Sequence, residues 1–320
     1  MGLLGGFDFL ENHYAKNPLE IVYANDIDKD AVVTYKHNFG EHITCDDIRK
    51  IQSSDLPNFD ILVGGFPCQT FSMIGQRKGL DDPRGELYFE MSRVLADKQP
   101  LAFIGENVKG LVNLQKGAVF QQIIKDFERV GYNVAWKILN ASNYGIPQKR
   151  ERVFIVGFRK DLSVRFGFPK PLNYIVPLGK VIESNVDDKY TFSERAVQGL
   201  KNSNKAFNKG RVQNLDFPSN TINSHLAKVS LNGTDPVLAL DAEKDIYRRF
   251  TPLEAARIQS FPDTFSFPVS EYQAYRQIGN AIPPVLMWHV AQNVIKSLNE
   301  SKSKAENFDF ELEEIEPLFA

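Results

Sequence analysis

Short β-rich apolar runs alternate with helix-like stretches over residues 20–160, and this alternation constrains the fold more than any other feature. The expected strands cover residues 21–24, 59–63, 101–104, 134–139 and 153–158. The expected helices cover residues 28–39, 85–97 and 118–130. Strands that alternate with helices are typical of a parallel sheet covered by helices. The sequence therefore predicts an α/β fold.

The rest of the chain differs in residue composition and in the length of its apolar runs. From about residue 162 to 247, Gly, Asn, Pro and Ser are frequent and apolar runs are short, which predicts a smaller, loop-rich region. Thr251 is expected to cap a helix with Pro252 at its first position, and residues 285–298 to form a last helix. The predicted organisation is a first domain at 1–161, the loop-rich domain at 162–247, a return to the first domain at 248–300, and a mobile acidic tail at 301–320.

Composition excludes several classes of protein. Two cysteines in 320 residues cannot form a disulfide framework, so a reducing, cytoplasmic location is expected. No apolar run has the length of a membrane span, and no leader resembles a signal peptide. The five histidines show no spacing typical of metal ligands. We therefore expect no membrane and no metal.

The net charge of −2 hides an uneven distribution. Six acids and no base follow Lys304. Between Arg195 and Lys228 the chain carries six bases and a single acid, Asp216. Such a run is either a solvated face or a surface that contacts phosphates.

Cys68 stands in a position that suggests chemistry. The apolar run 59–63 ends at Gly64-Gly65, and a Pro-Cys-Gln-Thr-Phe-Ser loop follows at 67–72. Strand ends followed by glycine-lined loops are where open α/β sheets keep reactive groups. The alternative is that Cys68 is a small buried hydrophobe.

Three other local patterns carry polar groups. Glu106 follows the expected strand 101–104, and Arg150 and Arg152 stand two apart before another strand, where they would share a face. Gly279-Asn280 is expected to form a turn before the last helix. Taken singly, the carboxylate could be a helix cap, the arginines a surface ion pair, and the Gly-Asn pair a plain turn.

Taken together and in this order, these segments resemble the motifs of bacterial DNA (cytosine-5) methyltransferases. The segments are 67–72, 106–108, 148–152, 251–257 and 279–280. The resemblance covers about 7–160 and 248–298, whereas the middle region matches only loosely, at Thr221-Ile222. It implies a Rossmann-like S-adenosylmethionine-dependent methyltransferase sheet with a smaller, loop-rich target-recognition domain.

The resemblance also implies a mechanism, in which the Cys68 thiolate adds to carbon 6 of cytosine and so activates carbon 5 for methylation. Glu106 would hold or protonate N3, and Arg152 would bind the O2 side of the base and help lower the pKa of Cys68. Arg150 belongs to the same catalytic set. The cytosine must leave the duplex, and the polar loop 75–85 would close over it.

Site residues for S-adenosylmethionine and for double-stranded DNA follow from the same resemblance. The implied cofactor residues are Gly5, Gly6, Phe7, Asp26, Ile27, Asp47, Ile48, Pro67, Asn280 and Ala281. From the residues alone, an acid after a strand suits ribose hydroxyls, but Asp26 could also serve as a helix cap. The implied DNA-contacting residues are Gln69, Ser72, Arg84, Lys201, Lys205, Lys209, Arg211 and Thr221. A monomer is expected, with a restriction endonuclease acting on the same DNA site.

The chain departs from the family pattern at its start. The family opens with a strand and a Phe-x-Gly-x-Gly-Gly loop, but here only Gly5 and Gly6 fit that loop and no strand precedes them. An exposed sheet edge and an open cofactor pocket are expected from this departure. Either the start is clipped or misassigned, or the chain is a weakened member of the family. Two further alternatives are an RNA cytosine-5 methyltransferase and a catalytically silent DNA-binding protein or subunit. The sizeable region 162–247 favours DNA over RNA, and the presence of Cys68, Glu106 and Arg152 opposes a silent protein.

Overall fold

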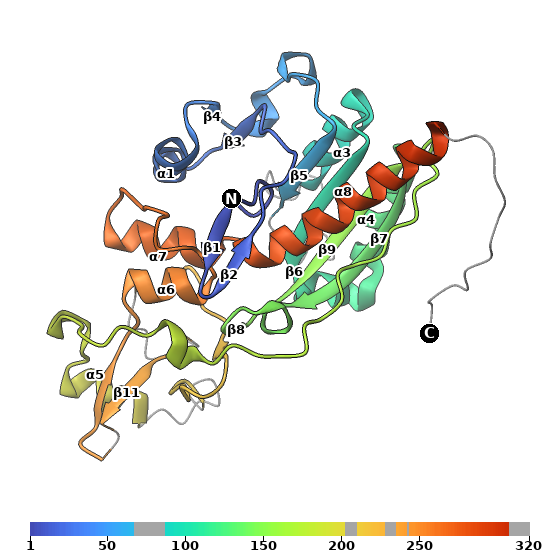
Figure 1. Ribbon diagram of the computed structural model, residues 1–320. Helices are drawn as coiled ribbons and strands as arrows, with labels where there is room; N and C mark the ends of the chain where they lie inside the picture. The colour runs from blue at the N-terminus through green and yellow to red at the C-terminus, as the bar shows by residue number, and fades with distance from the viewer. Residues whose placement is uncertain (67–86, 202–209, 228–234, 242, 307–320) are drawn as a thin grey trace.

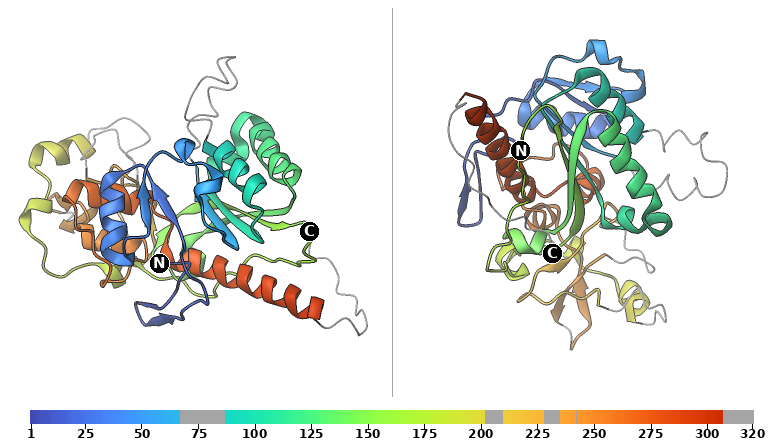
Figure 2. Two further views of the ribbon diagram at one scale, coloured as in Figure 1. Left: turned by 90° about the horizontal axis from the view of Figure 1, so that it is seen from above. Right: turned by 90° about the vertical axis from the view of Figure 1, so that its right-hand side faces the viewer.

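The computed structural model describes residues 1–66, 87–201, 210–227, 235–241 and 243–306. Its largest sheet contains four strands in the order β5 (Ile61–Gly65), β6 (Ala102–Val108), β9 (Glu151–Arg159) and β7 (Tyr132–Asn140). Helices α3 (Leu87–Lys98) and α4 (Ala118–Arg129) cover one face, and α8 (Pro284–Glu306) crosses the other (Figures 1 and 2). The predicted α/β fold class is confirmed.

The prediction of a parallel sheet was wrong, because the sheet is mixed. β5 and β6 are parallel, whereas β9 runs antiparallel to both of its neighbours. β7 and β9 are joined only by residues 141–150. A parallel connection needs a crossover of a dozen or more residues, so this short link brings β9 back antiparallel beside β7. Direction is set by the link rather than by the apolar pattern of the strands.

Alternate residues of the central strands serve two separate cores. Phe103, Val153 and Ile155 pack with α3 and α4, whereas Phe154 and Val156 pack with the cluster that contains α8. All five side chains are fully buried. Each buried side chain of this size contributes about 1.5–3 kcal/mol to stability. The sheet that carries Glu106 and Arg152 is therefore held rigidly from both faces.

A small parallel pair lies beside this sheet (Figure 1). It consists of β3 (Ala24–Asp26) and β4 (Ile43–Cys45), and α1 (Lys29–Phe39) connects them. The side chain of Asp28 caps α1 by accepting hydrogen bonds from the N–H groups of Asp30 and Ala31. The helix is found where it was predicted, but the strand lies at 24–26 rather than 21–24 and ends in Asp26 itself.

The N-terminal residues form a hairpin of β1 (Phe7–Phe9) and β2 (Asn12–Tyr14). Gly5 and Gly6 precede it with φ angles of 62° and 71°, a conformation that favours glycine. A Cβ on Gly5 would lie 2.1 Å from the carbonyl oxygen of Ala15, so no side chain fits there. The indole of Trp288 donates a hydrogen bond to the same oxygen, which ties the hairpin to α8.

The middle region contains α5 (Glu194–Lys201), β10 (Ser219–Asn220), β11 (Leu238–Asp241) and β12 (Ile246–Arg248). β10 pairs in parallel with β8 (Gln148–Lys149) from the first half of the chain. Short 3-10 helices occur at Ile48–Lys50, Ser53–Asp55, Lys109–Gly117, Ala141–Tyr144, Leu178–Val181 and Asp188–Tyr190. The domain boundaries at 162 and 247 stay predictions.

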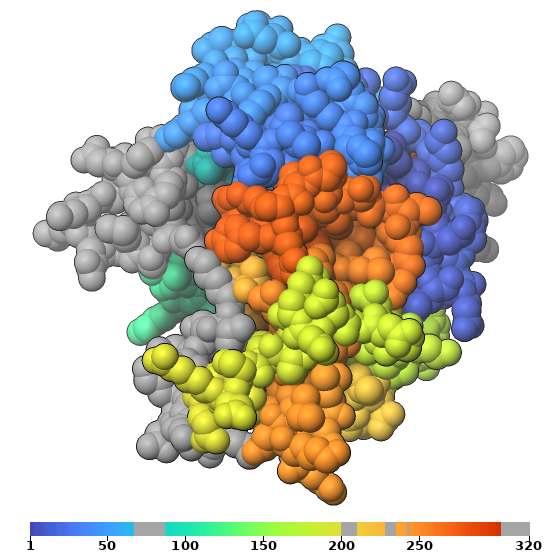
Figure 3. Space-filling model, turned by 90° about the vertical axis from the view of Figure 1, so that its left-hand side faces the viewer, coloured from blue at the N-terminus to red at the C-terminus, as the bar shows by residue number. Residues whose placement is uncertain are grey.

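The C-terminal segment adds α6 (Pro252–Ile258), α7 (Glu271–Asn280) and α8. Of these, α6 and α7, in orange, lie between the blue N-terminal segment and the yellow-green middle region (Figure 3). The predicted Thr251 cap is confirmed and forms a reciprocal capping box with Glu254. The expectation of a free turn was wrong, because Gly279-Asn280 is the end of α7. The tail boundary at residue 301 stays a prediction, and α8 runs to Glu306, past the expected helix end at residue 298. Good helix formers after residue 298 and an i,i+4 contact between Lys296 and Glu300 extend it. Residues 307–320 lie outside the described part.

Glu254 connects both ends of the middle region to α6. Its carboxylate accepts hydrogen bonds from both Nη atoms of Arg248 at 2.7 and 2.6 Å, and from the backbone N–H of Glu183 at 3.0 Å. Arg248 and Glu254 are 3% and 0% exposed at their side chains. One buried carboxylate thus fixes the chain near the beginning and at the end of the loop-rich region.

Candidate active site

Glu106 and Arg152 form an ion pair between two neighbouring strands. Nε of Arg152 lies 3.1 Å from Oε1 of Glu106, and their side chains are 13% and 15% exposed. Val108 is the register partner of Arg152, so the pair is diagonal across β6 and β9. Glu106 lies inside β6 rather than after it, which excludes the helix-cap alternative.

Burial raises the pKa of the Glu106 carboxyl, and the positive charges of Arg152 and then Arg150 partly oppose this rise. A carboxyl of this kind holds a proton more readily than one in water. Glu106 can therefore exchange a proton with a group that binds beside it. That property is the one required of a general acid.

The residue before the cysteine loop lies beside this ion pair. Nδ2 of buried Asn107 donates a hydrogen bond of 2.6 Å to the carbonyl oxygen of Phe66. Gly65 is the register partner of Glu106, and a Cβ on Gly65 would lie 3.7 Å from Oε2 of Glu106. The start of the loop and the carboxylate are thus fixed on adjacent strands. Pro67, Cys68, Gln69, Ser72, Arg84 and the loop 75–85 lie outside the described residues.

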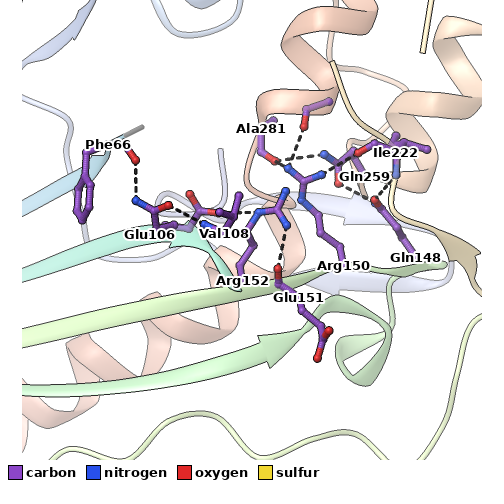
Figure 4. A network of polar contacts seen from close by, with 12 residues as sticks. Phe66, Glu106, Val108, Gln148, Arg150, Glu151, Arg152, Ile222, Gln259 and Ala281 are labelled. Carbon is purple, nitrogen blue, oxygen red and sulfur yellow. Dashed lines mark hydrogen bonds and ion pairs between the residues drawn. The ribbon is translucent and has the colours of Figure 1, made fainter. Parts of the chain in front are cut away.

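Arg150 and Arg152 do not share a role, although their spacing predicted a shared face. Arg150 is 2% exposed, and Nη1 donates to the carbonyl oxygen of Ile222 at 2.9 Å. Nη2 donates to the carbonyl oxygens of Gly279 and Ala281 at 2.9 and 3.1 Å (Figure 4). Burial lowers the pKa of Arg150 to about 9, so it stays charged near neutral pH. Its guanidinium joins two segments of backbone through three carbonyl oxygens, so the surface-ion-pair alternative is wrong for it.

Two buried glutamines complete this network and were missed from the sequence. Nε2 of Gln148 donates to Oε1 of Gln259 at 2.7 Å, and its Oε1 accepts from the N–H of Ile222 at 2.9 Å. Gln259 in turn donates to the carbonyl oxygen of Ile278 at 2.6 Å. Gln148 stands within the motif 148–152, but no pattern in the sequence distinguishes Gln259 from a surface glutamine.

The acids expected to hold a cofactor lie at one edge of the small parallel pair. Asp26 ends β3, and Asp47 follows β4, so both lie at the carboxyl ends of adjacent parallel strands. The carboxylates also make local contacts: Asp26 accepts from the N–H of Asp28, and Asp47 accepts from the N–H of Arg49. The contacts with Arg49 lower the pKa of Asp47 to about 2. Ile27, directly after Asp26, is 67% exposed, which is unusual for so apolar a side chain.

The end of α7 lies near the same edge. Nη1 of Arg276 makes an ion pair of 2.9 Å with Oδ2 of Asp28, the residue that caps α1. Asn280 is exposed at the end of this helix, and Ala281 follows it. Ile48 begins the 3-10 helix after β4, and Phe7 is a buried residue of the hairpin strand β1. Asp26, Ile27, Asp47 and α7 are therefore brought to one side of the molecule.

The expected DNA-contacting residues are only partly described. Lys201 is the last residue of α5, and Lys205 and Lys209 lie outside the described residues. Arg211 departs from the expectation of an exposed basic run, because it is 5% exposed and Nε donates to the carbonyl oxygen of Asp235 at 2.7 Å. The hydroxyl of Thr221 donates to the carbonyl oxygen of Lys149, which attaches the middle region to the strand that leads to Arg152.

In the described ranges, we find no cluster of three or more His, Cys, Asp or Glu side chains that could hold a metal ion. The helices of those same ranges include none that is both long and apolar enough to span a membrane.

Comparisons with known proteins agree with this geometry. A family model described as C-5 cytosine-specific DNA methylase matches residues 3–296. Type II methyltransferase M.DsaV of Dactylococcopsis salina is 38% identical over 301 residues, covering 92% of this chain and 85% of its own. Type II methyltransferase M.NlaX of Neisseria lactamica is 39% identical over 289 residues, covering 89% and 91%. Among solved structures, S. pombe Dnmt2 methyltransferase superposes with a TM-score of 0.74 at 21% identity, covering 88% of this chain and 93% of its own.

Proposed function

The chain belongs to the family of C-5 cytosine-specific DNA methylases, and from this premise we propose that it methylates carbon 5 of a cytosine flipped out of double-stranded DNA. Its curated relatives are type II methyltransferases, which supports a place in a restriction–modification system beside an endonuclease of the same site. The observation that carries the proposal is the partly buried Glu106–Arg152 pair, in which Glu106 lies on the strand next to the start of the cysteine loop.

In this proposal Cys68 acts as the nucleophile. Its thiolate forms a bond to carbon 6, and the electron pair of the 5,6 double bond becomes available at carbon 5. S-adenosylmethionine, when bound, supplies the methyl group. A base such as water then accepts the proton on carbon 5, and the electron pair of that C–H bond restores the 5,6 double bond as the bond between carbon 6 and sulfur breaks. Covalent addition is needed because carbon 5 of cytosine is a poor nucleophile.

Glu106 and Arg152 would hold the base during this addition. The raised pKa of Glu106 suits a group that donates a proton or a hydrogen bond to N3, which draws electrons from carbon 6. Arg152 is fixed by its contact with Glu106 and would bind O2. Arg150 reaches backbone carbonyls instead, which supports a positioning role for it.

The residues at the edge of β3 and β4 fit S-adenosylmethionine. The exposed apolar face of Ile27 suits the adenine ring, and the carboxylates of Asp26 and Asp47 suit the hydroxyl and amino groups of an adenosine. Gly5 and Gly6 are proposed for this site on the resemblance alone, because the side-chain position of Gly5 is taken by the carbonyl oxygen of Ala15. Binding of the cofactor would also distinguish an enzyme from a silent DNA-binding protein, which need not hold it. An RNA substrate is less well supported, because the relatives matched over most of the chain are type II methyltransferases.

Trapping with 5-fluorocytosine tests the proposal. Duplex DNA with this base at the target should give a complex that resists denaturant, because fluorine cannot leave carbon 5 as a proton does. Cys68→Ser should abolish the complex, whereas Cys45→Ser, at an exposed cysteine, should leave it intact. A trapped complex in the Cys68→Ser variant would refute the assignment of the nucleophile.

A further inference from the structure

The end of α7 touches the middle region without any side chain between them. A Cβ placed on Gly279 would lie 2.2 Å from the carbonyl carbon of Asn223 and 2.3 Å from the backbone nitrogen of Ser224. Both groups belong to the backbone, so neither can swing aside. Glycine is therefore required at position 279 for the two backbones to approach this closely.

The side chain of Arg150 joins the same two segments by hydrogen bonds. Nη1 bonds to the carbonyl oxygen of Ile222, and Nη2 bonds to those of Gly279 and Ala281, on either side of Asn280. A buried charged donor has no water to replace such partners, so separating the segments would leave it unsatisfied. The pair Gln148–Gln259 repeats the link, since Gln148 accepts from Ile222 and Gln259 donates to Ile278.

These segments serve different ligands in the proposed function, on which this inference rests. Asn280 is placed with the cofactor, and Arg276, one helical turn before it in α7, is paired with Asp28, the cap of α1 that follows Ile27. Thr221 is placed with the DNA and precedes Ile222 directly. The contact between Gly279 and Asn223 therefore lies between the two proposed binding sites.

We propose that Gly279 and Arg150 are positioning residues that join the cofactor site to the recognition segment 221–224, so that a bound cofactor tightens the binding of DNA. A ligand that holds Asn280 also restricts the backbone packed against Gly279. The recognition segment then loses less conformational freedom when DNA binds. By linkage, DNA must tighten the binding of the cofactor by the same factor.

The dissociation constant of duplex DNA, measured with and without saturating S-adenosylhomocysteine, tests the proposal. The duplex carries the site identified by sequencing the methylated cytosines of DNA from cells that express the chain. In the unaltered protein we expect S-adenosylhomocysteine to tighten DNA binding about tenfold. Gly279→Ala should reduce this factor to below about twofold, and Arg150→Lys should reduce it in part.

Gly167→Ala is the matched control, because a Cβ on Gly167 would meet no atom within 4 Å. It should keep the full factor. If Gly279→Ala fails to fold, hydrogen exchange of the unaltered protein replaces it: S-adenosylhomocysteine alone should slow exchange of the Asn223 and Ser224 amides. A tightening factor near one in the unaltered protein, an unchanged factor in Gly279→Ala, or unchanged exchange would each overturn the inference. A protein that binds neither DNA nor S-adenosylhomocysteine would instead refute the proposed function.

Discussion

Replacing Glu106 with Gln separates its chemical role from its structural one. Gln keeps the shape of the side chain and an oxygen for Arg152 at the position where Nε now lies 3.1 Å away. It cannot supply a proton. The expected loss is therefore that of general acid help, a fall in turnover of about a hundredfold or more, with DNA affinity little changed. Single-turnover methyl transfer to duplex DNA measures it.

Glu151→Gln provides the control, because Glu151 adjoins Arg152 in sequence but pairs with Lys109 at the surface. Its turnover should equal that of the unaltered protein. Turnover of Glu106→Gln within a few-fold of the unaltered value, or an equal loss in both variants, would show that the carboxylate of Glu106 only supports the strand.

The same substitution should also change how the stability of the folded protein depends on pH. Burial raises the pKa of Glu106, although Arg152 opposes it. A carboxyl whose pKa is raised in the folded protein contributes stability below its ordinary pKa and loses that contribution as pH rises through the folded pKa. The unaltered protein should therefore lose stability relative to Glu106→Gln as pH is raised above the ordinary value of 4.5. Melting temperatures of both proteins across this range measure the difference, and parallel curves would refute the burial argument.

Three further predictions concern other parts of the molecule. Ile27→Ala should weaken S-adenosylhomocysteine binding about tenfold by calorimetry, with no loss of thermal stability because Ile27 is 67% exposed; unchanged affinity would exclude it from the cofactor site. Arg248→Met leaves the Glu254 carboxylate buried without its counter-charge and should lower the free energy of unfolding by about 3–5 kcal/mol in urea titrations, and a loss below about 1 kcal/mol would contradict the clamp that Glu254 forms on Glu183 and Arg248. Charge reversal of three lysines should flatten the salt dependence of DNA binding by about one unit of slope for each phosphate contact removed, and an unchanged slope would mean a merely solvated face. These lysines are Lys201, Lys205 and Lys209.

The helices with local signals were the predictable part of this fold. Asp28 before α1 and Thr251-Pro252 at α6 are caps whose hydrogen bonds stay within one turn of chain, so the sequence specifies them. The direction of β9 depends on contacts beyond one turn of chain, whereas the extension of α8 past residue 298 has local causes that the pattern of apolar residues did not include. Strand direction follows from which strands meet in space, and the apolar pattern of 153–158 is the same for either direction.

The candidate site was predictable to the same degree. The strands bring Glu106 and Arg152 together as their motifs suggested, because each motif lies on a central strand. Arg150 was misjudged because it stands between β8 and β9, where the alternation of a strand does not hold. Arg211 and Gln259 are buried by segments distant in sequence, and no local sequence pattern predicts such burial.

The Glu254 clamp has a consequence for how such a chain can diversify. Because Glu183 and Arg248 meet on one carboxylate, the intervening segment leaves and rejoins the rest of the protein at a single place. Insertions or deletions inside that segment need not move either of its anchors. A graft from a relative should therefore exchange the residues between the two anchors but keep Glu254 and residues 219–223 of this chain, since their hydrogen-bond partners Gln148 and Arg150 stay with the host. The region can be treated as an exchangeable unit that is attached to the rest of the protein at Glu254 and, within the unit, at residues 219–223.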